Sequence, residues 1–318
     1  MLTAGQGTRL RPYTENTPKP ALGFLNLPLA YYGFYLAKQA GFTQFLLNKH
    51  HLPNQIEELA KELSQFTQNV ETIDETKKLL GSAGAIWNAR EIIAKHEYFL
   101  IANGDEILLP QDKNILNKLV SRFKETKTLC CLLTCEHPDL LKTLKPVWVN
   151  DAGDVQAFGM EKPSSKAKPV HYTGYKVFSK RILDFLPEGE SNIFYDVLIQ
   201  AIADGNRVGT LHLENSAWHE TGDFDSFLKA SREVATNNLP EINERLSFFS
   251  KKTLITNKNA ESFVVHPDGE NPNSLASLRG TVVLGEHCSL GKGAHLENVI
   301  VSSKVTILEN SKHLNCII

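Results

Sequence analysis

The chain has 318 residues, of which 42% are hydrophobic and 22% charged, and its basic and acidic residues nearly balance, with a formal net charge of −2. This is the composition of a globular protein with one large domain or two unequal ones, and a chain of this size needs no disulfide or metal to stabilise its core. The balanced charge gives no strong overall field toward nucleic acid or anionic lipid. No apolar run reaches the roughly 18 residues of a membrane-spanning helix. We therefore expect neither a nucleic acid nor a membrane as a partner.

The cysteines and the N-terminal residues indicate the compartment. The five cysteines form no Cys-x-x-Cys pair, and Cys130, Cys131 and Cys135 lie in the apolar stretch LCCLLTC. This pattern is typical of buried, reduced thiols rather than of a disulfide framework. The first residues, MLTAGQGTRLRP, lack the basic and then apolar pattern of a signal peptide. We predict a cytoplasmic protein.

Short apolar runs alternate with helix-period runs over residues 1–235. We expect strands at 45–48, 69–73, 98–103 and 128–134, because these runs are short and bounded by polar or turn residues. Between the first two, Ile56, Leu59 and Leu63 have helical spacing, and Pro53 suits a first helical turn. The alternation predicts an α/β fold with a Rossmann-like, mostly parallel sheet and helices on both faces. In such sheets, ligands bind beyond the carboxyl ends of the strands.

The last third of the chain has a different character. Residues 236–276 are rich in Asn, Ser, Lys and Pro, which is typical of a linker or an irregular packing segment. Over 277–318, leucines recur every six residues, with Ser302 as the one exception. They are Leu284, Leu290, Leu296, Leu308 and Leu314. This period predicts a short left-handed parallel β-helix of hexapeptide repeats, whose two coils are too few to bury a core alone. We expect it to pack on the rest of the chain or on a partner subunit, which would make the protein a homo-oligomer.

The most informative segment is TAGQGTRLRPYTENTPKPAL, at residues 3–22. Gly5 and Gly7 bracket a turn directly after a presumed strand, where glycine lets the backbone approach a phosphate closely. Arg9, Arg11 and Lys19 place three cations within 11 residues, and three prolines stiffen the loop. A rigid cationic loop suits a polyanion such as a triphosphate. The segment is neither a P-loop nor a dinucleotide-binding fingerprint.

Only three residues precede this loop. A sheet of this kind normally begins with a strand of about five residues. Either the first strand is short, or the natural chain begins earlier. A missing central strand would lose ladder hydrogen bonds beneath the loop, so this feature bears on stability more than on the assignment of the loop.

The pattern G-x-G-T-R-x-x-P…P-K-P, from Gly5 to Pro20, resembles the signature of the sugar-1-phosphate nucleotidylyltransferases, and most closely that of the mannose-1-phosphate guanylyltransferases. Further segments are similar to the family in the same order: LLGSAGAI (79–86), NGD (103–105), MEKP (160–163), YTGYKVFS (172–179) and WHETGDFDSFLKA (218–230). The resemblance implies a catalytic domain over 1–235 that joins a nucleoside triphosphate to a sugar 1-phosphate and releases pyrophosphate. The tail over 277–318 is similar to the β-helix found in many members.

The resemblance implies Mg²⁺ as cofactor, with Asp105 and Glu220 as its ligands. Asp105 also fits on physical grounds, because it ends the apolar strand YFLIANGD at the edge where ligands collect. Mg²⁺ binds through one or two carboxylates together with substrate phosphates. Glu220 stands where the family has Asp, and Asp223 stands where the family has Thr after Gly222. Asp223 is therefore the alternative second ligand.

The resemblance also implies roles for further residues. Arg9 and Lys19 would hold the triphosphate and stabilise the departing pyrophosphate, and Lys162 would neutralise the phosphate of the sugar. Glu161 and Gly174 are expected at the sugar. The residues expected at the nucleotide are Ala4, Gly5, Gly7, Thr8, Gly81, Ala83, Gly84 and Gly104. Because a sugar phosphate is already a competent nucleophile, the reaction needs cations more than a general base.

Several functions stay open at this point. GTP and mannose 1-phosphate are favoured as substrates, because LGSAGAI is similar to the LGTAGA loop of guanylyltransferases that act on mannose 1-phosphate. Uridylyl or thymidylyl transfer to another sugar 1-phosphate is an alternative, since those enzymes share the scaffold. A non-catalytic, nucleotide-binding regulatory homologue is another, favoured by Glu at 220 and Asp at 223. Acyl transfer by the tail is disfavoured because two coils show no long cleft for an acyl-CoA.

Overall fold

The computed structural model describes residues 1–214, 218–237, 239–249, 253–259, 262–267 and 276–318. The chain divides into two compact units. The first unit comprises Met1–Gly5 and Gly33–Trp218, and the second comprises Gln6–Tyr32 and His219–Ile318. Helix α1 (Leu29–Gln39) and strand β12 (Trp218–His219) each contain a boundary between the units.

Strands and helices alternate along the first unit. Its strands are β3 (Gln44–Lys49), β4 (Asn69–Asp74), β5 (Tyr98–Ala102), β6 (Ile107–Leu108), β7 (Cys130–Cys135), β8 (Val147–Val149), β9 (Val155–Phe158), β10 (Lys168–Ser179) and β11 (Val208–Leu213). Its helices are α2 (Pro53–Leu63), α3 (Gly81–Asn88), α4 (Arg90–Ile93), α5 (Ile115–Thr126) and α6 (Ile199–Ala203), with shorter helical turns η4 (Ser64–Phe66), η5 (Lys180–Phe185) and the π-helical η6 (Ile193–Leu198). The four predicted strands and the helix predicted after β3 are all present.

The main sheet is mixed, which corrects the expectation of a mostly parallel sheet. Its strand order is β11-β7-β10-β8-β9, and β5 also pairs with β10. Strands β11 and β7 are parallel, but β10 runs antiparallel to β5, β7 and β8. Strands β3 and β4 form a separate parallel pair. The long strand β10 inserts between strands of the opposite direction, and the alternation of elements along a sequence does not reveal such an insertion.

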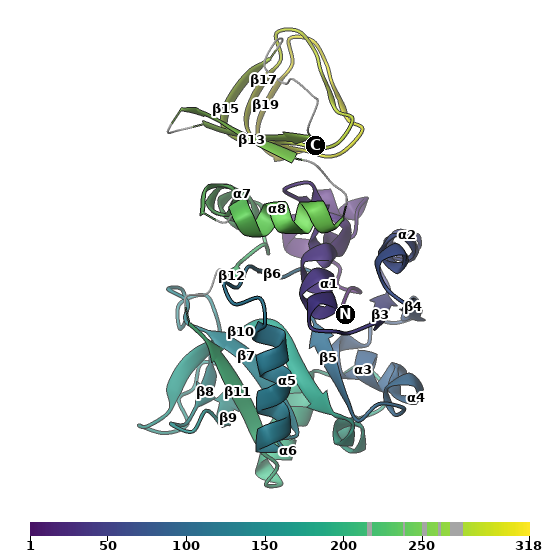
Figure 1. The fold of residues 1–318 in the computed structure, drawn as a ribbon, viewed down its shortest axis with the longest axis vertical. Helices are drawn as coiled ribbons and strands as arrows, with labels where there is room; N and C mark the ends of the chain where they lie inside the picture. Colours follow the sequence, from purple (N-terminus) through teal and green to yellow (C-terminus); the bar gives the residue numbers. More distant parts are fainter. Residues whose placement is uncertain (215–217, 238, 250–252, 260–261, 268–275) are drawn as a thin grey trace. The chain divides into compact units, whose positions relative to one another are not determined.

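Helices cover both faces of this sheet (Figure 1). On one face, Cys130 and Leu132 of β7 pack in a cluster with residues of α3, α4 and α6. Because successive side chains of a strand point to opposite faces, Cys131 lies on the other face. Burial raises the pKa of the Cys131 thiol to about 12, and Arg122 of α5 partly offsets this effect. The cysteines of LCCLLTC are buried free thiols, as predicted.

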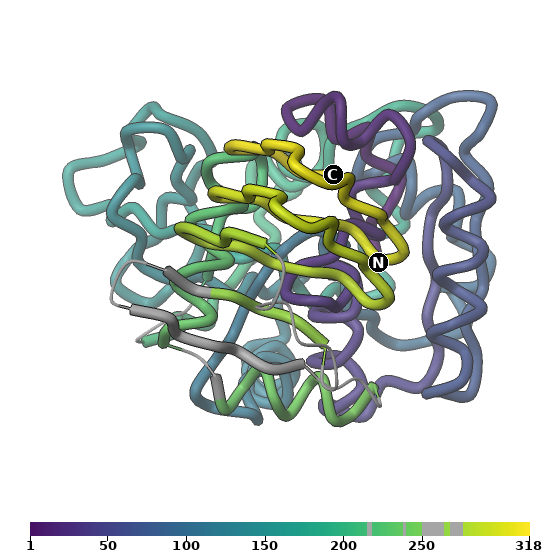
Figure 2. Tube along the Cα trace, turned by 90° about the horizontal axis from the view of Figure 1, so that it is seen from above, coloured from purple at the N-terminus to yellow at the C-terminus, as the bar shows by residue number. Residues whose placement is uncertain are grey.

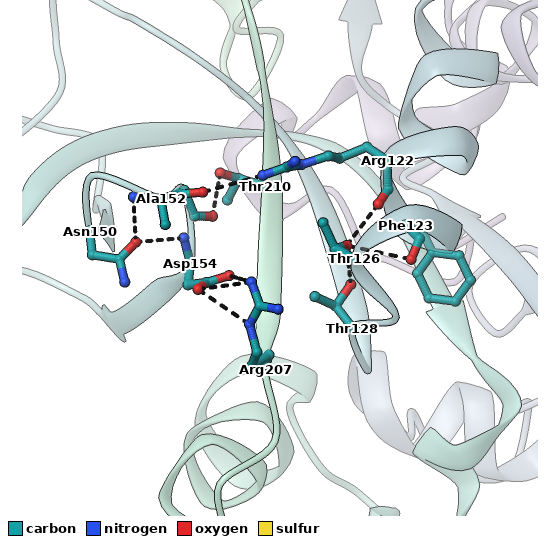
Figure 3. A network of polar contacts seen from close by, with 10 residues as sticks. Arg122, Phe123, Thr126, Thr128, Asn150, Ala152, Asp154, Arg207 and Thr210 are labelled. Atoms are coloured by element: carbon teal, nitrogen blue, oxygen red, sulfur yellow. Dashed lines mark hydrogen bonds and ion pairs between the residues drawn. The ribbon is translucent and has the colours of Figure 1, made fainter.

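The turn of the β8–β9 hairpin is tied to β11 (Figure 3). The Asp154 carboxylate accepts hydrogen bonds from the Arg207 guanidinium at 2.9 and 3.3 Å. The Thr210 hydroxyl donates to the Gly153 carbonyl at 2.8 Å. These contacts fix the hairpin from which the segment 159–163 continues.

The second unit holds the glycine loop from Gln6 onward and the C-terminal part of the chain. Its elements are η1 (Thr8–Leu10), η2 (Tyr13–Glu15), η3 (Lys19–Ala21), β1 (Gly23–Phe24), β2 (Leu27–Pro28), α7 (Phe224–Asn237), α8 (Leu239–Phe248), β13 (Thr253–Asn259), β14 (Ser262–Pro267), β15 (Ser277–Leu284), β16 (Ser289–Leu290), β17 (His295–Val301), β18 (Thr306–Ile307) and β19 (Lys312–Ile317). The ring of Phe24 packs edge-on against Phe227 of α7, with centroids 5.4 Å apart. The loop is thereby anchored on helix α7.

The region 236–276 contains helix α8 and strands β13 and β14, which corrects the expectation of a linker or irregular segment. Ile242 and Leu246 lie four residues apart on α8 and are both buried. A short amphipathic helix needs few apolar residues, so the polar composition hid this one. Residues 238, 250–252, 260–261 and 268–275 of the same region lie outside the described residues. The domain boundaries at 235 and 277 stay predictions.

The tail forms a parallel ladder, β14-β15-β17-β19, beside a second parallel pair, β16-β18 (Figure 2). Leu284 and Leu296 are buried as the six-residue period predicts, but Leu308 and Leu314 are 71% and 43% exposed. The register shifts between Arg279 and Val282 on pairing with β17, so the strict six-residue frame is not kept. The parallel strands are thus observed, and the hexapeptide β-helix stays a prediction.

Candidate functional site

The glycine loop of the second unit folds around Gly7. Its φ of 61° lies in the left-handed region, and it precedes the turn η1. A Cβ there would lie 2.8 Å from Thr14 Cγ2 and 3.2 Å from Lys19 Cβ. The Thr14 hydroxyl donates to the Gly7 carbonyl at 2.9 Å. The turn expected at this glycine is therefore present, and both its backbone conformation and its close neighbours require glycine.

Two segments far apart in the sequence meet in the second unit. Arg9 Nη2 of the glycine loop lies 3.4 Å from Glu220 Oε1 of the WHETGDF segment, with side chains 68% and 30% exposed. Gly222 lies so close that a Cβ would overlap both Glu220 Oε1 and Arg9 Nη2. Lys19, in turn η3, is 8% exposed. The structure thus brings Arg9 and Glu220 together and explains the glycine between them.

Asp223 has a structural role at the start of helix α7. Its Oδ1 accepts a hydrogen bond from the backbone N–H of Ser226 at 2.9 Å, and its carbonyl accepts from Phe227 N–H. This is the geometry of a helix N-cap, a position that favours Asp. The cap accounts for Asp at this position and engages one of its carboxylate oxygens. Which of Glu220 and Asp223 is the second metal ligand stays a prediction.

In the first unit, Asp105 follows the end of strand β5. The backbone N–H of Asn103 donates to the Gly174 carbonyl of β10 at 3.0 Å, and Gly104 N–H donates to the Leu2 carbonyl at 2.9 Å. The segment before Asp105 is therefore held on both sides by backbone hydrogen bonds. Asp105 itself is partly buried. The backbone that leads to Asp105 is thus fixed, and the role of Asp105 as a metal ligand stays a prediction.

Glu106 is a neighbouring carboxylate that the sequence analysis missed. Its Oε1 accepts from Asn103 Nδ2 at 3.1 Å, and its Oε2 accepts from Trp218 Nε1 at 2.8 Å. Gly174 has a φ of 93°, and a Cβ there would lie 2.5 Å from Glu106 Cγ. Gly174 thus makes room for Glu106, and its contact with a sugar stays a prediction. The sequence feature that could have indicated Glu106 is its position directly after the NGD motif.

Trp218 is a buried packing residue with a second role as the donor to Glu106. Its ring lies 4.1 Å from that of His171 and 5.1 Å from that of His137. Burial lowers the pKa of His171 to about 4. His171 is therefore neutral near pH 7 and acts here as a packing ring.

The small residues at the start of helix α3 pack against the backbone of residues 189–191. A Cβ at Gly81 would lie 2.6 Å from the Ser191 carbonyl oxygen, and one at Gly84 would overlap the Gly189 carbonyl oxygen. The Ala83 N–H donates to the Ser191 carbonyl at 2.9 Å. This packing alone requires small side chains at these positions, whether or not a ligand binds there. Contact of Gly81, Ala83 and Gly84 with a base stays a prediction.

The remaining predicted residues are mostly exposed. Glu161 and Lys162 follow the β8–β9 hairpin, and Lys162 Nζ lies 5.7 Å from the centroid of the Trp148 ring. Gly5 has no neighbour within 4 Å of a Cβ position. Thr8 is exposed at the start of turn η1, and Ala4 is buried.

A lysine of the YTGYKVFS segment, to which the sequence analysis gave no role, is buried in the first unit. Lys176 of β10 is 1% exposed, and its ammonium donates to the Tyr172 hydroxyl at 2.7 Å. The rings of Tyr172 and Phe194 lie 4.7 and 5.0 Å from Nζ. Burial lowers the pKa of Lys176 to about 8, against the opposing influence of Cys130 and Glu106.

The described residues contain no group of three or more His, Cys, Asp or Glu side chains arranged to hold a metal ion. None of the helices within those ranges is both long and apolar enough to span a bilayer.

Comparison with known proteins identifies the family. The nucleotidyl transferase family matches residues 1–237. The UTP–glucose-1-phosphate uridylyltransferase of Synechocystis sp. is 24% identical over 321 residues, covering 95% of this chain and 81% of that protein. The mannose-1-phosphate guanylyltransferase of Mycobacterium tuberculosis is 23% identical over 308 residues, covering 96% and 80%.

A solved structure shows the same fold. A UDP-glucose pyrophosphorylase from Acinetobacter baumanii has a TM-score of 0.61 at 19% identity, and the match covers 79% of this chain and 98% of that one. The resemblance seen in the sequence motifs is confirmed, with an α/β fold of mixed sheet and helices. The chain belongs to the nucleotidyl transferase family.

Proposed function

We propose that this protein transfers a nucleotidyl group from a nucleoside triphosphate to a sugar 1-phosphate, releasing pyrophosphate. The observation that carries the proposal is the meeting of Arg9 and Glu220, 211 residues apart in the sequence, at 3.4 Å within one compact unit. These residues belong to the two motifs that open and close the family resemblance. The match of the nucleotidyl transferase family to residues 1–237 supports the same activity.

Mg²⁺ is the cofactor that we propose for Asp105 and Glu220. Their carboxylate oxygens are the donors that this hard ion prefers. Mg²⁺ is usually held by one or two carboxylates together with substrate phosphates rather than by a closed protein cage. Because Asp223 caps helix α7, we assign the second carboxylate to Glu220. When bound, the ion neutralises charge on the phosphates.

The chain's own contribution to the reaction is positioning and charge. An oxygen of the sugar phosphate attacks the α-phosphorus, and the bond from that phosphorus to the leaving pyrophosphate breaks. Arg9 and Lys19 stabilise the negative charge that collects on the pyrophosphate. Arg9 is suited to this because its side chain is 68% exposed and can reach a ligand. No general base is needed, since the attacking phosphate is already ionised.

We assign the sugar phosphate to Lys162 and the sugar to Glu161 and Gly174. The nucleotide would lie against the glycine loop, Ala4 to Thr8, and against Gly104 at the end of β5. Gly81, Ala83 and Gly84 at the start of helix α3 would support the base. The backbone contacts that hold the ends of β5 and α3 give these segments fixed positions, which favours a preorganised site.

GTP and mannose 1-phosphate are the substrates that we propose, on the strength of the LGSAGAI segment. The relatives carry names with both bases, uridylyl and guanylyl, so a uridylyltransferase or thymidylyltransferase on another sugar 1-phosphate is the alternative. A nucleotide-binding homologue without turnover is favoured only by Glu220 and Asp223 where the family pattern has Asp and Thr. The capping role of Asp223 weakens that reading.

We further propose a left-handed hexapeptide β-helix for the tail, a homo-oligomer formed through it, and a cytoplasmic location. The parallel order β15-β17-β19 and the buried Leu284 and Leu296 support the β-helix. Leu308 and Leu314, which are exposed, offer apolar surface for a partner subunit. The sedimentation behaviour of the chain with and without Leu308→Ser and Leu314→Ser tests this assembly.

Pyrophosphate release tests the activity. The protein is incubated with each of GTP, UTP, dTTP, ATP and CTP, paired with mannose, glucose and N-acetylglucosamine 1-phosphates, with Mg²⁺ or with EDTA. We expect turnover that requires Mg²⁺, is highest for GTP with mannose 1-phosphate, and needs more Mg²⁺ in Asp105→Asn. No turnover of any pair by well-folded protein would contradict the proposal. Nucleotide binding without turnover, measured by thermal shift, would favour the non-catalytic homologue.

A further inference from the structure

A buried carboxylate, that of Glu75, lies directly after strand β4 in the first unit. Glu75 is 3% exposed. Its backbone N–H donates to the Lys49 carbonyl at 2.9 Å, and its own carbonyl contacts His50 Nδ1 at 2.7 Å. Strands β3 and β4 are parallel, so Glu75 lies at the carboxyl end of the pair, the edge where ligands collect in α/β folds. The reaction proposed above gives Glu75 no role.

The two oxygens of this carboxylate accept hydrogen bonds from two different segments. Oε1 accepts from Asn48 Nδ2 at 2.8 Å, and Oε2 accepts from the backbone N–H of Leu80 at 3.1 Å. Asn48 belongs to β3, whereas Leu80 immediately precedes helix α3, which has no side-chain cap at its N-terminus. A negative charge is favourable near the N-terminus of a helix. Glu75 therefore ties the start of α3 to the end of β3.

Asn48 extends the network to the beginning of the glycine loop. Its Oδ1 accepts from the Thr3 N–H, and its carbonyl accepts from the Thr3 hydroxyl, both at 2.6 Å. Thr3 and Asn48 are both buried. Because Ala4 follows Thr3 and Gly81 follows Leu80, one continuous set of buried hydrogen bonds connects the two segments to which the nucleotide is assigned.

The network requires an ionised carboxylate at position 75. Both neighbours donate N–H groups, so a carboxylate can accept from both, whereas a carboxamide would turn its NH₂ group toward one of the donors. Burial raises the pKa of the Glu75 carboxyl, and the hydrogen bonds from Asn48 and Leu80 act in the opposite direction. A buried donor left without an acceptor costs more than an average hydrogen bond contributes. The network is therefore sensitive to one atom of the Glu75 side chain.

We propose that Glu75 is a positioning residue for nucleotide binding, which holds the start of the glycine loop and the start of helix α3 in place through Asn48 and Leu80. Both of its carboxylate oxygens are engaged and the side chain is buried, so Glu75 acts through these segments and not by contact with the nucleotide. The inference rests on the proposed function, which assigns Ala4 and Gly81 to the nucleotide.

Exchanging the amide and the carboxylate between positions 48 and 75 tests this role. In Glu75→Gln, an NH₂ group faces either Asn48 Nδ2 or the Leu80 N–H. In Asn48→Asp, two carboxylates face each other in a buried site. In the double variant, the new amide donates to the new carboxylate, its oxygen accepts from the Leu80 N–H, and the Thr3 N–H keeps its acceptor. The double variant thus restores every hydrogen bond with the charge moved by one side chain.

Each single variant should bind nucleoside triphosphate about tenfold more weakly than the natural chain, because a buried hydrogen bond is lost. Independent losses would multiply to about a hundredfold in the double variant, whereas the restored network should keep it within about threefold of the natural chain. The dissociation constants of GTP and UTP with Mg²⁺ are measured by thermal shift. The KM for the nucleotide should rise in the same single variants while the KM for the sugar 1-phosphate stays unchanged, a split that a general loss of stability does not produce.

Thr210→Val is the matched control, because it removes a buried hydroxyl that donates to the Gly153 carbonyl at 2.8 Å, a contact that involves neither segment. It should lower the melting temperature and leave nucleotide affinity unchanged. If Glu75→Gln binds nucleotide as tightly as the natural chain, or the double variant binds no more tightly than the weaker single variant, the inference is overturned and the proposed function stands. A natural chain that binds neither triphosphate overturns both.

Glu75→Asp keeps the experiment decisive if Glu75→Gln does not fold. It retains the charge, but its shorter side chain cannot reach both donors. We expect it to weaken nucleotide binding about tenfold, with the KM for the sugar 1-phosphate unchanged. Nucleotide affinity equal to that of the natural chain in Glu75→Asp overturns the inference.

Discussion

Arg9 of the second unit and Lys176 of the first unit are cations in opposite surroundings. The Arg9 side chain is 68% exposed and pairs with Glu220 at 3.4 Å, an arrangement that adds little to stability because water screens it. Lys176 is 1% exposed, and its ammonium is held by one phenol oxygen at 2.7 Å between two aromatic rings. The first cation is available to a ligand, whereas the second is enclosed by packing.

This difference separates activity from stability. At Arg9 and Glu220, substitutions should change turnover and leave folding nearly unchanged, because surface pairs contribute little to the unfolding free energy. At Lys176, substitutions should change the free energy of unfolding and its pH dependence, because a buried charge is desolvated. Each of the following experiments tests one side of the contrast.

Glu220→Gln should give the largest effect. Gln can still accept a hydrogen bond from Arg9, but it removes the carboxylate charge proposed to hold Mg²⁺. We expect kcat/KM to fall about 10³-fold with an unfolding free energy within about 0.5 kcal/mol of the natural chain. The measurement is initial-rate kinetics of pyrophosphate release together with urea unfolding. Asp151→Asn, at an exposed pair with Lys168, is the matched control and should keep full activity. A large loss of stability in Glu220→Gln would contradict the view that the exposed Arg9–Glu220 pair affects turnover and not folding.

Gly222→Ala should give the next effect. The added methyl would overlap Glu220 Oε1 and Arg9 Nη2, which are the mobile ends of their side chains. The pair should move apart at small cost in folding, and displacement of a positioned group by about 1 Å lowers the rate about 100-fold. Gly23→Ala in the same unit is the control, because nothing lies within 4 Å of its Cβ position. Kinetics equal to those of Gly23→Ala would show that the geometry of the Arg9–Glu220 pair does not matter.

The sequence alone predicts the exposed half of this contrast better than the buried half. The glycine loop and Arg9 stood out by their residue types, and Glu220 was assigned by the family resemblance; the structure brings Arg9 and Glu220 together, and their roles at a ligand stay predictions. The four strands and helix α2 were found because their apolar periods are local. These features depend on short stretches of sequence, so they can be predicted without knowledge of contacts between distant segments.

The missed features all depend on contacts between distant segments. Lys176 carries no sign of burial, because its surroundings come from Tyr172 and Phe194 in the folded chain. Glu106 gains its role from Trp218, 112 residues away. The antiparallel direction of β10 follows from its neighbours in the sheet. In the tail, β16 pairs with β18 in a register that places Ile307, not Leu308, opposite Leu290, so Ile307 is buried and Leu308 is exposed.

Lys176→Met tests how the buried lysine charge affects stability. The unfolded lysine titrates near 10.5 and the folded one at about 8, so between these values the unfolded chain binds more protons and the natural chain gains stability as pH rises. Met has no charge to desolvate, so we expect the variant to be the more stable one at pH 7. Its advantage should shrink by about 2 kcal/mol between pH 7 and 9.5. Urea unfolding of both chains at the two pH values measures this change.

Lys168→Met is the control for that experiment, because Lys168 is exposed and its pKa is raised by Asp151. Its stability difference from the natural chain should stay constant over the same pH range. A constant difference for Lys176→Met as well would mean that Lys176 titrates normally and that its surroundings do not penalise the charge.

Substitutions of Asp223 should have the smallest effect on turnover. They also distinguish the role of the Asp223 carboxylate from that of the Glu220 carboxylate. Asp223→Asn keeps an oxygen that accepts from Ser226 N–H, so stability and turnover should both stay close to those of the natural chain. Asp223→Ala loses the cap and should lower the unfolding free energy by about 1 kcal/mol while keeping most of the turnover at low temperature. If Asp223→Asn instead lost activity as Glu220→Gln does, at unchanged stability, Asp223 would be a metal ligand. Helix α7 would then place a functional carboxylate at its own N-cap, and the exposed region would combine both roles in a single residue.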